Sequence, residues 1–340
     1  DLALQGWAAT AEDLGNARHT AVALVIRGSH QCFSDPEGSR LVLQDAFERC
    51  GAVGESYWET YAECGLAFCW IMLERIDQAR PLLDHMEARA RRLGNPQLVA
   101  DALSRRAVID YTAGRYAEIE ATCRELEGEF AQLTHVNVTA APRSMLMSAE
   151  AVRGRGLVHE AAARELLGAY LRSGEIQHVP LIIGALADIL IATDRAAGAE
   201  PMLAELAGLV EPYPYFRVRT RHRRALVAMA LDDRATAREL LDRTAEDTSA
   251  IGNLATGAET AILLAVLDRR DRRHRAAFDH AWAGASGAAV LGAEQTLAAA
   301  LEVLAALLAD TDRHQAAARL LGAAGAARAG GLHVEQRRPG

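Results

Sequence analysis

The chain has 340 residues, of which half are hydrophobic, 24% are charged and only 5% are aromatic. Its formal net charge is -8 with an isoelectric point near 5.8, which argues against attraction of the whole surface to nucleic acids or anionic membranes. No apolar stretch reaches the roughly 18 residues of a membrane span, and no signal peptide opens the chain. We therefore expect a cytoplasmic protein.

Cysteine usage points away from disulfides and metals. The five cysteines are an odd number, lack a C-x-x-C spacing and are not accompanied by suitably spaced histidines. We expect reduced, partly buried thiols, no metal and no cofactor. The positions are Cys32, Cys50, Cys64, Cys69 and Cys123.

Helical patterns follow one another along the whole chain. Residues 1–14 are expected to be an incomplete repeat, because the chain begins inside a helical pattern that breaks at Gly15-Asn16. This start suggests a fragment of a larger protein. Residues 38–50 are the second helix of the first complete pair. The later pairs are expected at 55–73 and 77–93, 97–113 and 115–133, 141–153 and 158–172, 176–193 and 195–210, 215–231 and 234–251, 254–269 and 273–291, and 294–309 and 314–329.

One short pattern recurs at the start of each second helix: a polar turn, a small residue and an apolar pair. It is clearest in LERIDQARPLL, residues 73–83. The recurrence gives a period of about 40 residues, with a shift to 42 expected in the fourth pair. The equivalent positions are Ser39, Ala79, Ile119, Ala161, Ala199, Ala237, Ala277 and Ala317.

A repeat of this kind predicts an all-α fold. Short connections make neighbouring helices antiparallel, and stacking of pairs buries the face that one pair cannot cover alone. We expect one right-handed superhelical solenoid of about eight pairs over residues 1–330, with residues 331–340 as a linker or tail. Alternating strand patterns are absent, apart from a weak hint at 136–139.

The motifs resemble tetratricopeptide repeats. Gly114-Arg115-Tyr116 followed by Ile119, and Gly156 followed by Ala161, resemble the turn and small-residue positions of such repeats. The segment RHQAAARLLGAAGAAR, residues 313–328, is similar to the end of the tetratricopeptide-like arrays in large ATP-dependent bacterial transcription regulators of the MalT and LuxR type. That resemblance implies an upstream ATPase module and often a C-terminal DNA-binding module. The chain has no phosphate-loop motif and no lysine, so neither activity is assigned to it.

The repeat register places a set of side chains on the inner side of the first helices. Such a groove, aromatic at one end and arginine-rich farther along, would suit an acidic peptide or an anionic effector, although a merely solvated helix face needs no ligand. These candidate binding residues are Tyr61, Phe68, Arg105, Arg143, Glu150, Asp188, Arg219, His222 and Arg223.

Two arginine clusters, 217–224 and 269–275, allow a nucleic-acid interpretation. A helix spreads such a run around its circumference, and Asp232, Asp233, Asp268 and Asp271 stand nearby, so ion pairing or partner docking is favoured over direct nucleic-acid binding. The aromatic helix at 57–70 allows a second interpretation, an apolar effector pocket, beside plain packing.

No catalytic residue is assigned and no enzyme is expected. The sequence has no H-E-x-x-H motif, no G-x-S-x-G elbow and no metal-ligand spacing. We expect a regulatory domain of a bacterial transcription regulator that binds a protein, a peptide or a small-molecule effector in its inner groove. The alternative is a scaffold that forms homo-oligomers and has no small-molecule ligand.

Overall fold

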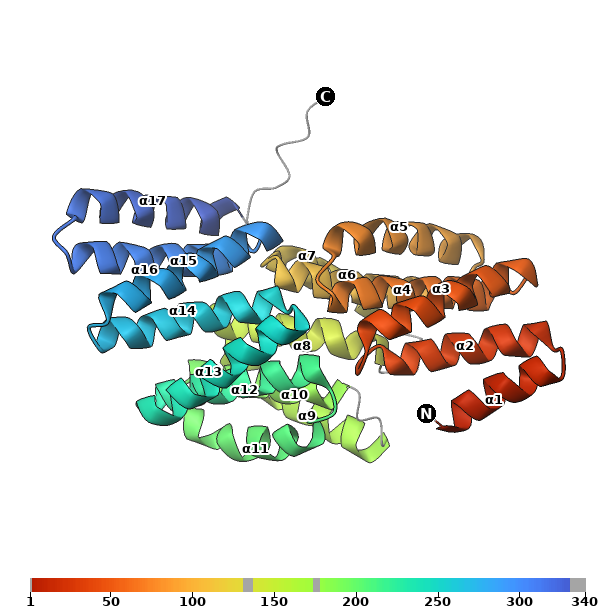
Figure 1. The fold of residues 1–340 in the computed structure, drawn as a ribbon. Coiled ribbons are helices and arrows are strands. Elements are labelled where there is room, and N and C mark those ends of the chain that lie inside the picture. Colours follow the sequence, from red (N-terminus) through yellow and green to blue (C-terminus); the bar gives the residue numbers. More distant parts are fainter. Residues whose placement is uncertain (1, 131–136, 174–177, 331–340) are drawn as a thin grey trace, which may run out of the picture. The chain divides into compact units, whose positions relative to one another are not determined.

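The fold was analysed in a computed structural model, which describes residues 2–130, 137–173 and 178–330 (Figure 1). Those residues form 17 α-helices and no strand. None of these helices combines the length and apolar character needed to cross a membrane. The all-α prediction is confirmed. By contacts between residues, the chain divides into two compact units.

Unit 1 comprises residues 1–109 and 122–139. Consecutive helices pack on each other, and one core cluster joins Leu24 and Val25 to Ala46, Cys50 and Ala62. The helices that lie wholly or largely in this unit are α1 (Leu2–Asp13), α2 (Ala17–Gln31), α3 (Pro36–Ala52), α4 (Ser56–Met72), α5 (Ile76–Arg92) and α6 (Pro96–Thr112).

Unit 2 comprises residues 110–121 and 140–340, and thus includes the connection between α6 and α7 (Tyr116–Gly128). Its helices pack in sequential antiparallel pairs, as α14 and α15 do in Figure 1. Its other helices are α8 (Asn137–Val152, entering from unit 1), α9 (Glu160–Ser173), α10 (Val179–Ala192), α11 (Glu200–Leu209), α12 (Pro214–Ala230), α13 (Arg234–Ile251), α14 (Leu254–Arg270), α15 (His274–Leu291), α16 (Glu294–Ala309) and α17 (His314–Gly330).

Most helices end in the same turn. A residue with positive φ follows the helix, and the amide of the next residue donates to a carbonyl five positions earlier, as Arg115 does to Asp110 at 2.8 Å. This is the Schellman motif, which satisfies carbonyls that a helix end leaves free. Many of these residues follow one another at intervals of 20: Gly54, Glu74, Gly94 and Gly114, and again Asp232, Gly252, Arg272, Gly292 and Asp312.

The regular turns set the repeat register. Of the eight predicted small or apolar positions, seven are buried, and six of these have no exposed surface. Ala161 is exposed and was assigned wrongly, as was the 42-residue shift. The turn residues Gly114, Gly154 and Asp194 stay 40 apart. A 3₁₀ turn (Gly156–His159) precedes α9, the second helix of the fourth pair. The buried small residue near the start of α9 is therefore Ala163 and not Ala161.

Most helix boundaries agree closely with the sequence predictions, but α8 begins at Asn137 rather than 141, α7 ends at Gly128 rather than 133, and α11 begins at Glu200 rather than 195. Arg234–Ile251 and Glu294–Ala309 were expected with the same ends. The expected linker at 331–340 lies outside the described residues, as does the start of the helix expected from Ile176. The strand hint at 136–139 was wrong, because residues 137–139 form the first turn of α8. The prediction of a single array over residues 1–330 stays a prediction.

Arg272→Gly is expected to increase the free energy of unfolding by about 1 kcal/mol. Arg272 has φ 59°, where a Cβ atom is strained and glycine is not. Arg272→Ala keeps the Cβ atom and is the matched control, with little change expected. Urea denaturation of the three proteins measures the effect. Equal stability of the glycine and alanine variants would contradict it.

Candidate functional site

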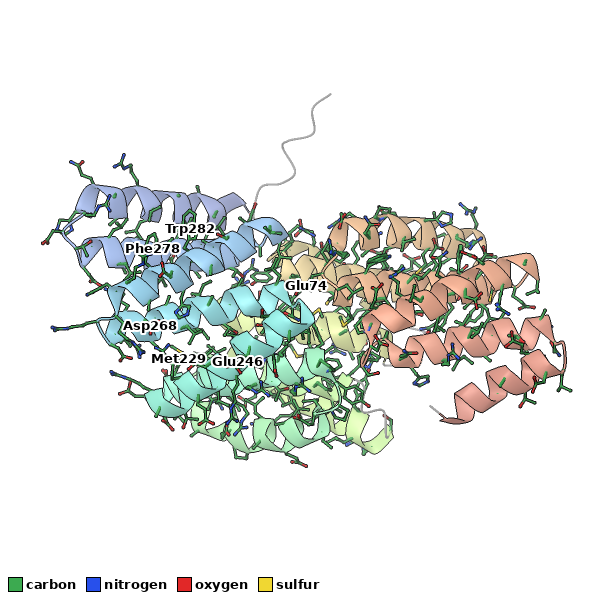
Figure 2. All side chains as sticks on the ribbon, in the orientation of Figure 1. Glu74, Met229, Glu246, Asp268, Phe278 and Trp282 are labelled. Carbon is green, nitrogen blue, oxygen red and sulfur yellow. The ribbon has the colours of Figure 1, made fainter. Side chains whose placement is uncertain are left out.

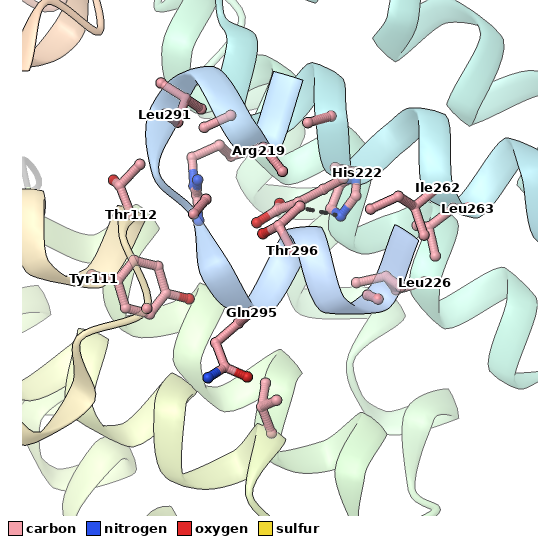
Figure 3. Close-up of a pocket in the computed structure, with 18 of the residues that line it drawn as sticks. Tyr111, Thr112, Arg219, His222, Leu226, Ile262, Leu263, Leu291, Gln295 and Thr296 are labelled. Carbon is pink, nitrogen blue, oxygen red and sulfur yellow. Dashed lines mark ion pairs between the residues drawn. The ribbon is translucent and has the colours of Figure 1, made fainter. Parts of the chain in front are cut away.

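Unit 2 contains a half-open cavity of about 410 Å³ (Figure 3). Its walls come from the end of α6, the start of α7 and the turn between them, and from α8, α12, α14, α15, α16 and α17. Tyr111, Arg219, His222 and Gln295 lie around the same opening in Figure 3 and come from three different parts of the chain. This volume is within the range of pockets that bind small organic molecules, about 300–1,000 Å³.

Arg219 is the distinctive side chain of this cavity. Its guanidinium carbon lies 6.0 Å from the ring centroid of Tyr111 and 5.8 Å from that of Tyr215. Within the described parts of the chain, no carboxylate lies within 4 Å of it. Burial lowers the pKa of Arg219, but the nearby Tyr215 and Glu259 raise it by more, so its pKa lies above the ordinary value and the group stays charged. The cavity therefore holds a cation that lacks a carboxylate partner.

The other arginines near Arg219 on α12 are paired. Arg221 contacts Asp247 at 2.7 Å, Arg224 contacts Glu200 at 2.5 Å, and Arg217 contacts Asp247 at 3.4 Å. Local pairing was expected for both arginine runs. In the run 269–275, Arg273 contacts Asp268 and Asp271 at 2.8 and 2.9 Å, and Arg270 lies 4.0 Å from Asp232. In the run 217–224, Asp232 and Asp233 were the wrong partners. The helix directs these arginines to carboxylates on α11 and α13 instead.

A polar layer lies beside the cavity. Arg223 donates from Nε and Nη2 to Asp188 at 3.1 and 3.0 Å, and the Ser148 hydroxyl donates to the same carboxylate at 2.7 Å. A Cβ atom on Gly184 would lie 2.8 Å from the guanidinium carbon of Arg223, so the glycine leaves room for this pair. Asp188 and Arg223 satisfy each other and hold α8, α10 and α12 together.

His222 is buried, with 8% of its surface exposed. Burial lowers its pKa to about 4, and the nearby Arg219 and Arg223 act in the same direction against the raising effect of Glu259. The ring is thus neutral at pH 7. Its Nδ1 lies 3.1 Å from the Thr260 hydroxyl, which orients the imidazole in the cavity wall.

Glu259 supplies the negative charge of the cavity. Its carboxylate lies 3.7 Å from Nε2 of His222, the contact dashed in Figure 3. That distance is too long for a hydrogen bond, and a neutral imidazole makes no ion pair, so we do not count the contact as charge compensation. Among the described residues no arginine lies within 4 Å of the Glu259 carboxylate. The other charged residue of the lining, Arg328, is bound to Glu302 at 2.8 Å.

The structure gives the other candidates in unit 2 different surroundings. Glu150 accepts hydrogen bonds from Arg155 across the turn after α8, at 2.5 and 2.7 Å, and thereby stabilises that turn. Arg143 is half-buried on α8 and does not line the cavity. Of the six candidates in this unit, Arg219 and His222 line the cavity, and Asp188 and Arg223 form the layer beside it.

The three candidates in unit 1 make a separate cluster. Phe68 is buried, packs edge-on against Phe33 with centroids 5.3 Å apart, and lies 3.9 Å from the guanidinium carbon of Arg105. Tyr61 stacks on Tyr57 and packs against the unit 1 core. Burial raises the pKa of Tyr61 to about 12. Phe68 and Tyr61 therefore contribute to packing within unit 1.

Sequence reasoning missed several lining residues, among them Tyr111, Glu259, Gln295 and Thr296. The 40-residue period could have found one of them. Glu259 stands one period after Arg219, and Ile262, also in the lining, stands one period after His222. Equivalent positions of neighbouring first helices share one side of the stack. Tyr111 carries no comparable signal.

The five cysteines are free and buried, as expected. Burial raises the pKa of the Cys64 and Cys69 thiols to about 11, which leaves them protonated at pH 7. In the described part of the chain, no three His, Cys, Asp or Glu side chains are grouped as for a metal ion.

Stability is expected to fall as the pH drops from 6.5 towards 4. The unfolded chain protonates His222 near the ordinary value of 6.5, whereas the folded chain does so only near 4. The loss should be on the order of 1–3 kcal/mol, and His222→Asn, which retains a polar group for Thr260, should remove it. Denaturation at pH 7, 5.5 and 4.5 measures the slope, with His314→Asn as an exposed control. Identical slopes for wild type and His222→Asn would refute this assignment.

Comparisons with known proteins give a fold but no family. No family model matches the chain, and no curated protein does. Among solved structures, a Rap protein complexed with competence and sporulation factor is similar, with a TM-score of 0.64 and 11% identity over 93% of this chain and 99% of that one. At this identity the likeness concerns the fold alone. It confirms the expected tetratricopeptide-like helical-repeat fold.

Proposed function

We propose that this chain is a binding domain of a bacterial transcription regulator, and that it binds an effector or a partner peptide in the unit 2 cavity. The observation that supports this most is Arg219, a cation in the cavity wall without a carboxylate within 4 Å among the described residues. Because unpaired charges inside a protein are costly, a bound anionic group would offset that cost.

The comparison agrees with a binding role. The similar Rap protein was solved complexed with competence and sporulation factor, so a helical-repeat fold of this kind accommodates a bound factor there. The assignment to a regulator of the MalT and LuxR type rests on the resemblance of the segment at 313–328. The protein or peptide partner, and the cytoplasmic location, belong to the same proposal.

Binding would act on the stacking of helix pairs. The cavity is formed by residues from several helices of unit 2, so a ligand there contacts more than one pair at once. A ligand that favours one arrangement of these pairs shifts the population towards it by the difference in its affinity for the two arrangements. Modules attached to the domain would respond to that shift.

Arg219→Gln should abolish capture of ligands by the cavity. The full chain is incubated with a pool of random-sequence peptides and with a pool of small organic carboxylates, and retained molecules are identified by mass spectrometry. Wild type should enrich members of at least one pool, and Arg219→Gln should retain less than about one tenth of them, the loss expected for a charged hydrogen bond. Arg217→Gln, on the same helix but paired with Asp247, is the control. Retention that is absent, or equal in wild type and Arg219→Gln, would overturn the proposal.

The alternative, self-association, is favoured by one observation. Phe278 and Trp282 on α15 stack with centroids 6.4 Å apart, although their surfaces are 45% and 60% exposed (Figure 2). Stacked aromatic side chains at a surface are common anchors of protein interfaces.

If this pair joins two copies, Trp282→Ser should weaken the dimer about tenfold or more. Sedimentation equilibrium of wild type and variant measures it, with Arg275→Ser as a control on the same helix. A wild-type chain that remains monomeric without ligand would exclude the scaffold role.

A further inference from the structure

The cavity contains one cation and one anion that do not pair with each other. Arg219 is on α12 and Glu259 is one repeat later on α14, and both line the same space. No ion pair within 4 Å joins them in the described part of the chain, although the Glu259 carboxylate raises the pKa of Arg219. Opposite charges that line one cavity without meeting can each receive the opposite charge of a ligand.

Other charges nearby are already neutralised. Arg223 is bound to Asp188, Arg328 to Glu302, and His222 is uncharged at pH 7. The remaining charge is thus one positive and one negative group. A multiply charged anion such as a phosphate ester fits poorly, because it would meet a single free guanidinium and the carboxylate of Glu259.

The rest of the wall is largely apolar. Leu226 on α12, Ile262 and Leu263 on α14, and Leu291 at the end of α15 face the cavity. These side chains would bury an aliphatic or aromatic group, at about 25 cal/mol for each Å² of apolar surface. A ligand with two opposite charges and an apolar body therefore matches all parts of the wall.

We propose that the cavity binds a small apolar zwitterion, an amino acid or a peptide of two or three residues with free termini. Its carboxylate binds Arg219, its ammonium binds Glu259, and its side chains contact Leu226 and Ile262. This inference rests on the proposed function, and it adds that both ends of the ligand are recognised. Tyr111 and Thr296 stand at the same opening and can donate hydroxyl hydrogen bonds (Figure 3).

The test is calorimetric titration of the full chain with leucine, dileucine and trileucine, each also in N-acetylated and in C-terminally amidated form. At least one free compound should bind, and the chain length that binds best distinguishes an amino acid from a peptide. Acetylation and amidation should each weaken that binding about 10- to 100-fold, the loss expected for one charged hydrogen-bonded group.

Two variants show which residue binds each end of the ligand. In Glu259→Gln acetylation should no longer matter, and in Arg219→Gln amidation should no longer matter, as a double-mutant cycle requires. Glu246→Gln and Arg217→Gln, both outside the cavity, should behave as wild type.

Two results would overturn the inference while leaving the proposed function intact. The first is equal binding of free and acetylated compounds. The second is absence of binding by all three leucine compounds when the random pools still yield an Arg219-dependent ligand. If the pools also yield no such ligand, both proposals fail.

Discussion

The left-handed turn after each helix is the constraint on which the rest of this structure depends. It ends a helix by satisfying two carbonyls in a three-residue connection, so successive helices are antiparallel. Because many turns recur at intervals of 20, first helices recur at intervals of 40. Positions one period apart then occupy equivalent places in neighbouring pairs, and side chains such as Arg219 and Glu259 line one cavity.

Small buried residues are the second half of this constraint. Ala237 and Ala277 have no exposed surface, and a larger side chain there would push the second helix away from its pair. Gly284 makes the same point for a glycine, since an added Cβ atom would lie 2.7 Å from the Ile262 side chain. Ile262 also lines the cavity, so close packing between α14 and α15 helps to shape the cavity wall.

Much of the fold could be predicted from the sequence because turn signals and small residues are local. Gly114 and Gly252 mark turns by residue type, whereas Asp232 and Arg272 adopt the same conformation and are recognised only by their spacing. The register of α9, the second helix of the fourth pair, was predicted wrongly. The 3₁₀ turn before this helix moves the buried small residue from position 161 to 163. Such a change in local winding leaves no residue-type signature.

The candidate site was predictable only in part, for a physical reason. The inner faces of first helices carry both structural and ligand-facing polar groups, and the sequence does not show which arginine meets a carboxylate. Arg223 finds Asp188 one pair earlier, at 3.0 Å, whereas Arg219 finds two aromatic rings. Arg219 and Arg223 differ in the side chains that they contact in the folded structure, and no local sequence pattern shows those contacts.

The contrast between Arg219 and Arg223 also supports the proposed binding role of Arg219 over a purely stabilising role. A cation over an aromatic ring gains about 0.5–1 kcal/mol at exposed sites and about 2 kcal/mol when desolvated, within about 6 Å of the ring centroid. The two rings beside Arg219 lie at 6.0 and 5.8 Å, at the edge of that range, and they supply neither the negative charge nor the paired hydrogen bonds of a carboxylate. Arg217, Arg221, Arg223 and Arg224 on the same helix all have carboxylates within 4 Å. An arrangement selected only for stability would give Arg219 the same. Its lack of one leaves electrostatic free energy in the cavity that a ligand carboxylate can recover, which is a recurring cost of preorganised binding sites.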